Sequence, residues 1–198
     1  PNGAGKSTLI GITSSLVNKT SGEVRIFGVV IAADRDAAMR LIGLVPQEIN
    51  FNMFEKPLDI CVNYAGFYGI PRAEALVRAE EELKRAQLWE KANVMSRTLS
   101  GGMKRRLMIA RAMMTRPRLL LLDEPLAGTS QAEAERLVQV MAGLKGQVTL
   151  VLIEHDMDAV FALADRVSVL VYGRIIATGT PDQVRADPAV RAAYLGDA

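Results

Sequence analysis

The chain has 198 residues, a formal net charge of +2 at pH 7, 49% hydrophobic residues and 23% charged residues. This balance is typical of one globular domain, or at most two small ones, and excludes a disordered, collagen-like or coiled-coil protein. The longest apolar runs fall far short of the roughly eighteen residues that span a bilayer, and the net charge alone does not indicate nucleic-acid binding.

The first predicted element is a phosphate-binding loop that leads into a helix. Gly5, Lys6 and Ser7 fill the last three fixed positions of the pattern G-x-x-x-x-G-K-[ST]. Backbone N–H groups and the helix N-terminus would bind phosphate, Lys6 would reach the β and γ phosphates, and Ser7 would hold Mg²⁺. The first glycine of the pattern and the strand that normally feeds it would precede residue 1, so we expect an incomplete N-terminus. Taken alone, the three positions also fit a glycine-rich turn before a helix.

Strands and helices then alternate along the chain. The alternation predicts an α/β fold with a mostly parallel sheet flanked by helices. Continuous apolar runs in the later strands predict burial on both faces. Within this single domain of residues 1–198, we expect an inserted helical subdomain at about residues 48–115. Strands are predicted at 22–27, 41–45, 118–122, 148–153 and 167–171, and helices at 131–144 and 156–164.

Two helices of the helical block have predicted apolar stripes. The first begins at Pro71, which is favourable at the first position of a helix. Its stripe is formed by Leu76, Ala79, Leu83 and Ala86, and its opposite face predicts ion pairs at Glu74–Arg78 and Glu81–Arg85. The stripe of the second helix consists of Met103, Leu107, Ala110 and Met114.

Two carboxylates follow the predicted strand at 118–122. The sequence Leu-Leu-Leu-Leu-Asp123-Glu124-Pro places both at the carboxyl edge of a parallel sheet, where ligands bind in such folds. Asp123 would coordinate Mg²⁺, and Glu124 would polarise an attacking water. The pair taken alone also fits a solvated strand end.

A third motif precedes the carboxylates by one predicted helix. Ser100, Gly101 and Gly102 stand at a helix start, where exposed N–H groups can bind an anion. In this order the three motifs resemble those of the nucleotide-binding subunits of ATP-binding-cassette (ABC) transporters, over essentially the whole chain. The resemblance implies a P-loop NTPase fold, bound ATP and Mg²⁺, and transport-coupled ATP hydrolysis.

The resemblance also assigns roles to residues. Gln47, after the strand at 41–45, matches the glutamine that touches Mg²⁺ and the attacking water, and His155 matches the histidine that contacts the γ-phosphate. The catalytic set is then Glu124, His155 and Gln47, and the metal set is Ser7, Gln47 and Asp123. The nucleotide-binding set is Asn2, Gly3, Ala4, Gly5, Lys6, Ser7, Thr8, Ser100, Gly101 and Gly102.

Partners follow from the same resemblance. Two ABC ATPase domains, identical or different, would meet head to tail, with each ATP between one phosphate loop and the other chain's Ser100–Gly102 segment. A transmembrane permease subunit would dock near the apolar residues Phe51, Met53 and Phe54, unless these fold back into the helical block. The protein would then lie on the cytoplasmic face of the cell membrane, and the single cysteine, Cys61, fits such a reducing compartment.

The sequence departs from the family pattern in places. Met103 stands where the family usually has glutamine, and Ser130 where it usually has aspartate. The aromatic residue that stacks on adenine would precede residue 1. Residues 1 to about 125 resemble exporter ATPases, whereas residues 126–198 resemble branched-chain amino-acid importer ATPases. The chain is therefore either a divergent member or two related genes joined near residue 125.

Two other functions fit parts of the sequence. A nucleic-acid-associated ABC ATPase is suggested by a basic stretch without acidic residues, but a helix with a solvated basic face is the preferred explanation, and no nucleic acid is expected. A non-catalytic, truncated nucleotide-binding module is suggested by the incomplete loop. The basic stretch contains Lys104, Arg105, Arg106, Arg111, Arg116 and Arg118.

Overall fold

A computed structural model describes residues 5–194 and confirms the α/β fold. No helix within this range is long and apolar enough to cross a membrane. The helices are α1 (Lys6–Thr13), α2 (Arg35–Arg40), α3 (Pro57–Phe67), α4 (Arg72–Arg85), α5 (Gly101–Met113), α6 (Gln131–Leu144), α7 (Met157–Leu163), α8 (Pro181–Ala186) and α9 (Pro188–Tyr194), with short 3₁₀ turns at Trp89–Lys91 and Ser96–Thr98. The strands are β1 (Arg25–Ile26), β2 (Val29–Val30), β3 (Ile42–Val45), β4 (Leu119–Asp123), β5 (Thr149–Ile153), β6 (Val167–Val171) and β7 (Arg174–Gly179).

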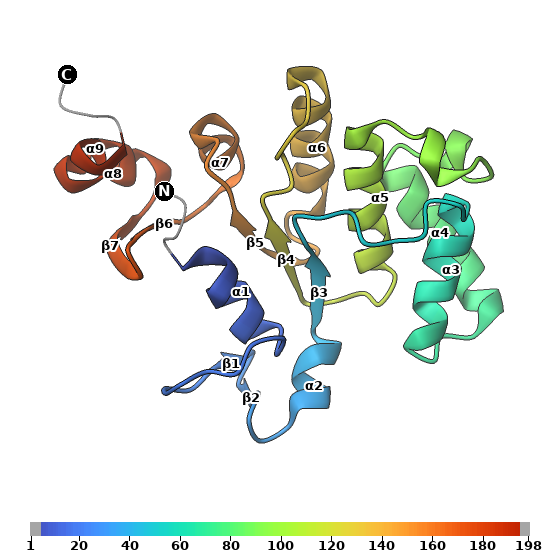
Figure 1. Cartoon of the computed structure of the whole chain (residues 1–198), viewed down its shortest axis with the longest axis horizontal. Helices are drawn as coiled ribbons and strands as arrows, with labels where there is room; N and C mark the ends of the chain where they lie inside the picture. The colour runs from blue at the N-terminus through green and yellow to red at the C-terminus, as the bar shows by residue number, and fades with distance from the viewer. Residues whose placement is uncertain (1–4, 195–198) are drawn as a thin grey trace.

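The central sheet is parallel, as the alternation of strands and helices predicts. Its order is β3-β4-β5, with Val45 opposite Leu122 and Asp123 opposite Ile153 (Figure 1). The four leucines of β4 are all buried, because this strand lies between two neighbours and beneath helices. The register brings the carboxyl ends of the three strands to one edge, so the loops that follow them meet there.

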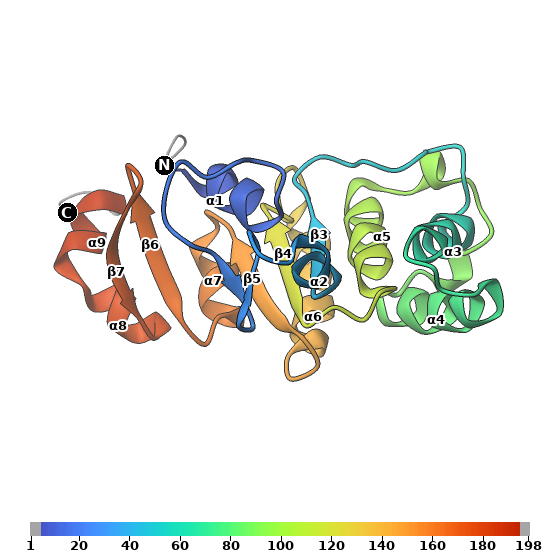
Figure 2. The same ribbon diagram turned by 90° about the horizontal axis from the view of Figure 1, so that it is seen from below.

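Helices cover the sheet and extend into a helical arm. One apolar core joins the sheet with α5, α6 and α7, and a second joins α3, α4 and α5. Helix α5 therefore serves both cores, with Met108 and Ile109 in the first and Leu107 and Ala110 in the second. Figure 2 shows the resulting order, with α3 and α4 at one end, the sheet in the middle, and α8 and α9 at the other end.

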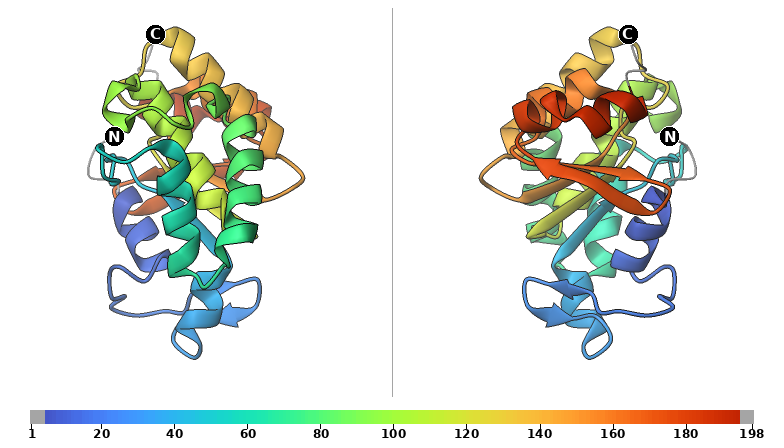
Figure 3. Two further views of the ribbon diagram at one scale, coloured as in Figure 1. Left: turned by 90° about the vertical axis from the view of Figure 1, so that its right-hand side faces the viewer. Right: turned by 90° about the vertical axis from the view of Figure 1, so that its left-hand side faces the viewer.

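The prediction that β5 is buried on both faces is wrong. Alternate residues of β5 are exposed, and Val151 keeps 40% of its surface accessible, because among the described residues β5 is the edge of the three-stranded sheet. Next along the molecule, β6 pairs antiparallel with β7 through a turn at Tyr172 and Gly173, and α8 and α9 pack on this hairpin (Figure 3). A groove of about 870 Å³ separates β5 from β6.

Helix α4 is rotated slightly from its predicted orientation. Ala75 is fully buried, whereas Leu76 is exposed, so the apolar stripe runs through the smaller residue. Pro71 is the residue before the helix rather than its first residue. Of the predicted ion pairs, Glu74–Arg78 forms, but Arg85 instead pairs with the largely buried carboxylate of Glu82 at 3.0 Å.

Candidate active site

The first component of the site is the start of α1. Gly5 precedes the helix with a φ of 94°, a left-handed conformation that glycine adopts readily. The Lys6 side chain is mostly buried, and its Nζ donates to Oε1 of Glu124 at 3.0 Å. Ser7 and Thr8 follow on α1 and are exposed. The predicted nucleotide-binding residues Asn2, Gly3 and Ala4 lie outside the described residues.

The second component is the edge where the parallel strands end. After β3, Gln47 donates from Nε2 to Oε2 of Glu124 at 3.1 Å. After β5, the Nδ1 atom of His155 lies 4.0 Å from Oε1 of Glu124. The structure thus brings Lys6, Gln47 and His155 around one carboxylate, from three different elements.

Glu124 has an unusual backbone as well as a crowded side chain. Its φ of 44° lies in the left-handed region, which for a residue other than glycine costs on the order of 1 kcal/mol and is common at functional sites. The conformation is fixed by a hydrogen bond from its N–H to the carbonyl of Ile153 at 2.9 Å. This turn at the end of β4 points the Glu124 carboxylate toward α1 and the loop after β3.

Asp123 lies beside Glu124, and the two carboxylates repel each other. Burial and the charge of Glu124 raise the pKa of Asp123 above its ordinary value, and Lys6 partly opposes this. A cation between the two carboxylates would relieve the repulsion.

The residues of the predicted metal set fit Mg²⁺. Ser7, Gln47 and Asp123 offer hydroxyl, amide and carboxylate oxygens, which are the donors that Mg²⁺ prefers. The described part of the chain contains no group of three or more His, Cys, Asp or Glu side chains arranged to hold a metal. An ion here would therefore complete its coordination with water and phosphate oxygens, as Mg²⁺ does in nucleotide sites.

Glu154 is a residue of this site that the sequence analysis missed. Its carboxylate is 1% exposed, and it accepts hydrogen bonds from the N–H groups of Leu126 at 2.7 Å and His155 at 3.1 Å. It therefore ties the loop after β4 to the loop after β5. The available signal was its position, since it is a charged residue directly after an apolar strand.

The basic stretch is only partly a solvated face, because Arg116 and Arg118 are exposed whereas Arg106 and Arg111 are buried. Arg106 is 2% exposed and Arg111 8% exposed, and burial lowers the pKa of both. Three arginines of the stretch donate hydrogen bonds to loops. Arg105 bonds the carbonyls of Pro46, Gln47 and Ala127. Arg106 bonds the carbonyls of Ala86 and Gln87, and Arg111 bonds Asn50. These three arginines therefore support loops of the fold.

The Ser100–Gly102 segment is not part of the cluster around Glu124. The Ser100 hydroxyl accepts the N–H of Met103 at 3.2 Å, which caps α5, and donates to Oε1 of Glu133 on α6 at 2.9 Å. Helix α5 lies on the other side of β3 from α1 (Figures 1 and 2). The predicted nucleotide-binding residues are therefore divided between two separate places on one chain.

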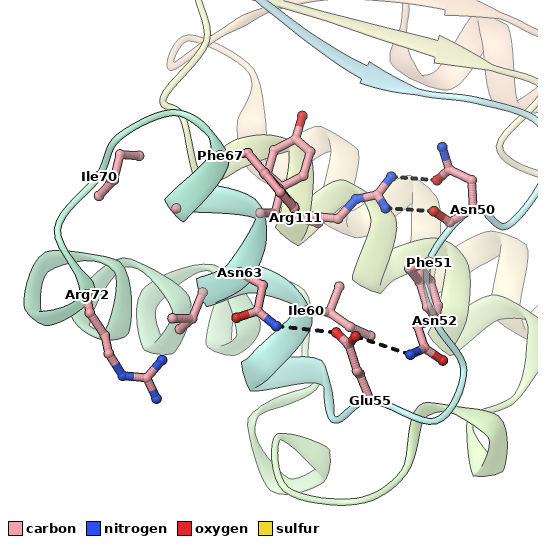
Figure 4. Close-up of a pocket in the computed structure, with 13 residues that line it drawn as sticks. Asn50, Phe51, Asn52, Glu55, Ile60, Asn63, Phe67, Ile70, Arg72 and Arg111 are labelled. Carbon is pink, nitrogen blue, oxygen red and sulfur yellow. Dashed lines mark hydrogen bonds between the residues drawn. The ribbon is translucent and has the colours of Figure 1, made fainter.

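A groove of about 700 Å³ opens beside α3 and the segment at residues 50–55. Figure 4 shows Arg111 bonded to Asn50 at one side and Glu55 accepting from Asn52 and Asn63 at the other. Phe67 lines the groove and is 87% exposed.

The three apolar residues predicted to form a docking cluster differ in how far they are exposed to solvent. Phe54 is 72% exposed, and Met53 is half-buried. Phe51 is also half-buried, but it packs against both apolar cores. Only part of the predicted cluster therefore presents a free apolar surface.

Comparisons with known proteins agree with this geometry. The sequence pattern of the family described as "ABC transporter" matches residues 1–127, and that of "Branched-chain amino acid ATP-binding cassette transporter" matches residues 174–198. The high-affinity branched-chain amino acid transport ATP-binding protein BraF of Pseudomonas aeruginosa is 36% identical, and the match covers 100% of this chain and 85% of BraF. The linearmycin resistance ATP-binding protein LnrL of Bacillus subtilis is 37% identical over 91% of this chain and 58% of LnrL.

Solved structures show the same fold. A dimeric ATP-binding cassette in a post-hydrolysis state, bound to ADP and Pi, superposes with a TM-score of 0.79 at 29% identity, over 91% of this chain and 82% of that one. The similarity therefore extends from the sequence to the arrangement of strands and helices.

Proposed function

The chain belongs to the ABC transporter family as an ATP-binding, ATP-hydrolysing subunit, and we propose that the cluster around Glu124 is where it hydrolyses ATP. The observation that carries the proposal is the convergence of Lys6, Gln47 and His155 on this carboxylate, within 3.0 to 4.0 Å. A lysine, an amide, an imidazole and a carboxylate at the N-terminus of a helix form a site suited to phosphoryl transfer to water.

Each residue has a role in this proposal. Lys6 exchanges its ion pair with Glu124 for the β and γ phosphates of ATP, which frees Glu124 to accept a proton from the attacking water. Gln47 orients that water and the carboxylate, and His155 contacts the γ-phosphate from the loop after β5. Glu154 holds His155 and the loop after β4 in a fixed position relative to each other. Ser7, Gln47 and Asp123 would hold Mg²⁺, which would supply positive charge to neutralise the phosphates.

We infer that two chains complete one site. Ser100 and its two glycines stand at the positive end of α5, and α5 lies on the other side of β3 from α1, which carries Lys6. A head-to-tail pair places this helix end of one chain opposite the phosphate loop of the other, so that the segment at residues 100–102 binds the partner's ATP. The dimeric form of the solved relative bound to ADP and Pi supports this arrangement.

The groove beside α3 is the proposed contact for a transmembrane subunit. It has exposed aromatic surface at Phe67, and the segment at residues 46–50 connects it directly to Gln47 in the ATP site. Arg111 fixes Asn50 within that segment through its carbonyl at 3.2 Å and its Oδ1 at 2.6 Å. A movement of Gln47 when ATP binds would therefore reach the groove through a short and well-held stretch of chain.

ATP binding to a Lys6→Ala variant tests the assignment of the phosphate loop. Loss of a charged hydrogen-bond donor costs about 1.5–3 kcal/mol, so the Kd for Mg-ATP should rise roughly 10- to 100-fold in calorimetry. The exposed Lys19, just after α1, is the matched control, and Lys19→Ala should bind as the unaltered chain does. Equal affinities of the Lys6→Ala variant and the unaltered chain would remove Lys6 from the site.

A further inference from the structure

The carboxylate of Glu133 lies against the start of α5, the helix end proposed to bind the partner's ATP. Glu133 stands in the first turn of α6. Its Oε1 accepts the Ser100 hydroxyl at 2.9 Å, and it packs so closely on Gly102 that a Cβ at that position would lie 2.3 Å from its Oε2. The chain thus places one of its own anions where an incoming phosphate is expected.

This contact competes with nucleotide. A serine hydroxyl has one proton to donate, and in the free chain Ser100 gives that proton to Glu133. A terminal phosphate that reached Ser100 would also meet the negative charge of Glu133, which Arg106 at 3.6 Å offsets only in part, and this is unfavourable in a partly buried place. Binding of the partner's ATP therefore requires Glu133 to release Ser100.

A second partner for Glu133 is already in position. Arg106 on α5 has an NH2 group 3.6 Å from Oε2 of Glu133, and its side chain is 3% exposed. Within residues 5–194, neither the Arg106 Nε nor the Glu133 Oε2 has a hydrogen-bond partner, although both atoms are buried. Arg106 is itself held by the carbonyl of Ala86 at 2.9 Å, so it stays in place if the carboxylate moves toward it.

We propose that Glu133 is an autoinhibitory residue that occupies the start of α5 in the free chain, and that it releases Ser100 and closes on Arg106, with which it already forms an ion pair, when the partner's ATP docks. This inference rests on the proposed two-chain site. According to this proposal, Glu133 raises the ATP concentration that two chains need to associate, and it leaves the affinity of a single chain for ATP at Lys6 unchanged.

The test measures ATP-dependent dimerisation of the full chain in a Glu124→Gln background, in which hydrolysis is blocked. Glu133→Gln keeps an oxygen that can accept from Ser100 but removes the negative charge. It should lower the ATP concentration for half-maximal dimer, measured by sedimentation, by about tenfold, which corresponds to a like-charge penalty of about 1.4 kcal/mol. The ATP affinity of the monomer should not change.

Two further variants separate this role from a structural one. Glu135→Gln removes the same charge from the exposed face of α6, and should leave dimerisation unchanged. Glu133→Asp keeps the charge beside Arg106 but shortens the reach to Ser100, so it should also lower the required ATP concentration, by a smaller factor. A melting temperature recorded for each variant identifies any loss of folding.

The outcomes distinguish the two levels of the proposal. If the parent dimerises but folded Glu133→Gln and Glu133→Asp need the same or more ATP, then Glu133 does not compete with nucleotide and the inference is overturned. If the parent binds ATP without dimerising at any ATP concentration, then the two-chain site and this inference both fail.

Discussion

Three carboxylates near the strand ends of this protein are held in different ways, and the differences match different tasks. Glu124 is reachable and paired with Lys6 at 3.0 Å, so it can exchange its partner for a substrate. Glu154 is buried, and its two oxygens are committed to backbone N–H groups. The pKa of Asp123 is raised by burial and by the neighbouring charge of Glu124, which favours the neutral form of this carboxyl. Only the first is free to act as a base.

Cys61 offers a residue-scale test of the helical arm. It is fully buried between α3 and its neighbours, and burial raises the pKa of its thiol to about 12. Because the thiolate is the reactive form, iodoacetamide should modify the native protein at pH 8 at least about 10³-fold more slowly than the same protein in denaturant. Native and denatured rates that agree within a few-fold would contradict the buried placement.

The same thiol predicts a direction of pH dependence. Between about pH 8.5, where an unfolded thiol ionises, and the raised native value, the folded protein binds more protons than the unfolded chain. The free energy of unfolding should therefore fall as pH rises through this range. Cys61→Ala should lose that part of the dependence in urea titrations at several pH values.

Among single residues, the sequence predicted those whose place in the site is set by the end of the strand that they follow. Gln47, Glu124 and His155 each follow an apolar run, and parallel strands bring such ends together. Glu133 and Arg106 were not predicted as partners, because their contact joins α6 to α5 through packing that no spacing records. The roles of the predicted site residues stay predictions until variants are measured.

At the scale of elements, the predicted burial of a strand was accurate where other elements cover the strand completely. The prediction for β4 is confirmed, since all four of its leucines are buried. The prediction that β5 is buried on both faces was wrong, because an apolar run does not show whether other elements cover both faces of a strand. The predicted apolar stripe of α4 was wrong at one position, because Ala75 and Leu76 fit adjacent helical stripes equally well. The helical subdomain at about residues 48–115 stays a prediction.

Two exposed aromatic residues test the proposed contact with a membrane subunit: Phe67 lines the groove, and Phe54 belongs to the segment at residues 50–55 beside it. Phe54 and Phe67 are 72% and 87% exposed, so changing both to serine should leave the melting temperature nearly unchanged. The double variant should lose binding to the membrane subunit, measured by co-purification from membranes, and should lose transport. It should keep the ATPase activity of the isolated chain.

Phe51→Ser is the comparison for this experiment. Phe51 packs against both apolar cores, so its loss should lower the free energy of unfolding by about 2 kcal/mol or more. Undiminished binding of the Phe54 and Phe67 double variant to the membrane subunit would show that the groove is not the contact.

At the scale of the whole molecule, the strand order separates the two halves of the proposed ATP site. The carboxyl ends of β3, β4 and β5 gather Glu124 and its neighbours beside α1, whereas α5 begins on the other side of β3. One chain therefore presents the predicted phosphate loop at one place and the start of α5 at another, and in the proposed two-chain site a second chain joins them. The match of residues 174–198 to the branched-chain amino acid family agrees with the importer-like sequence of that part.

The most direct test of the proposed site is the steady-state Mg-dependent ATPase rate of the Glu124→Gln variant. The substitution keeps the shape of the side chain but removes the proton acceptor, so the rate should fall roughly 10²- to 10⁴-fold while ATP still binds and ATP-dependent dimers accumulate. Glu90→Gln, an exposed carboxylate in the Trp89–Lys91 turn, should retain the full rate. A Glu124→Gln rate equal to that of the unaltered chain would contradict the assignment of Glu124 as the base.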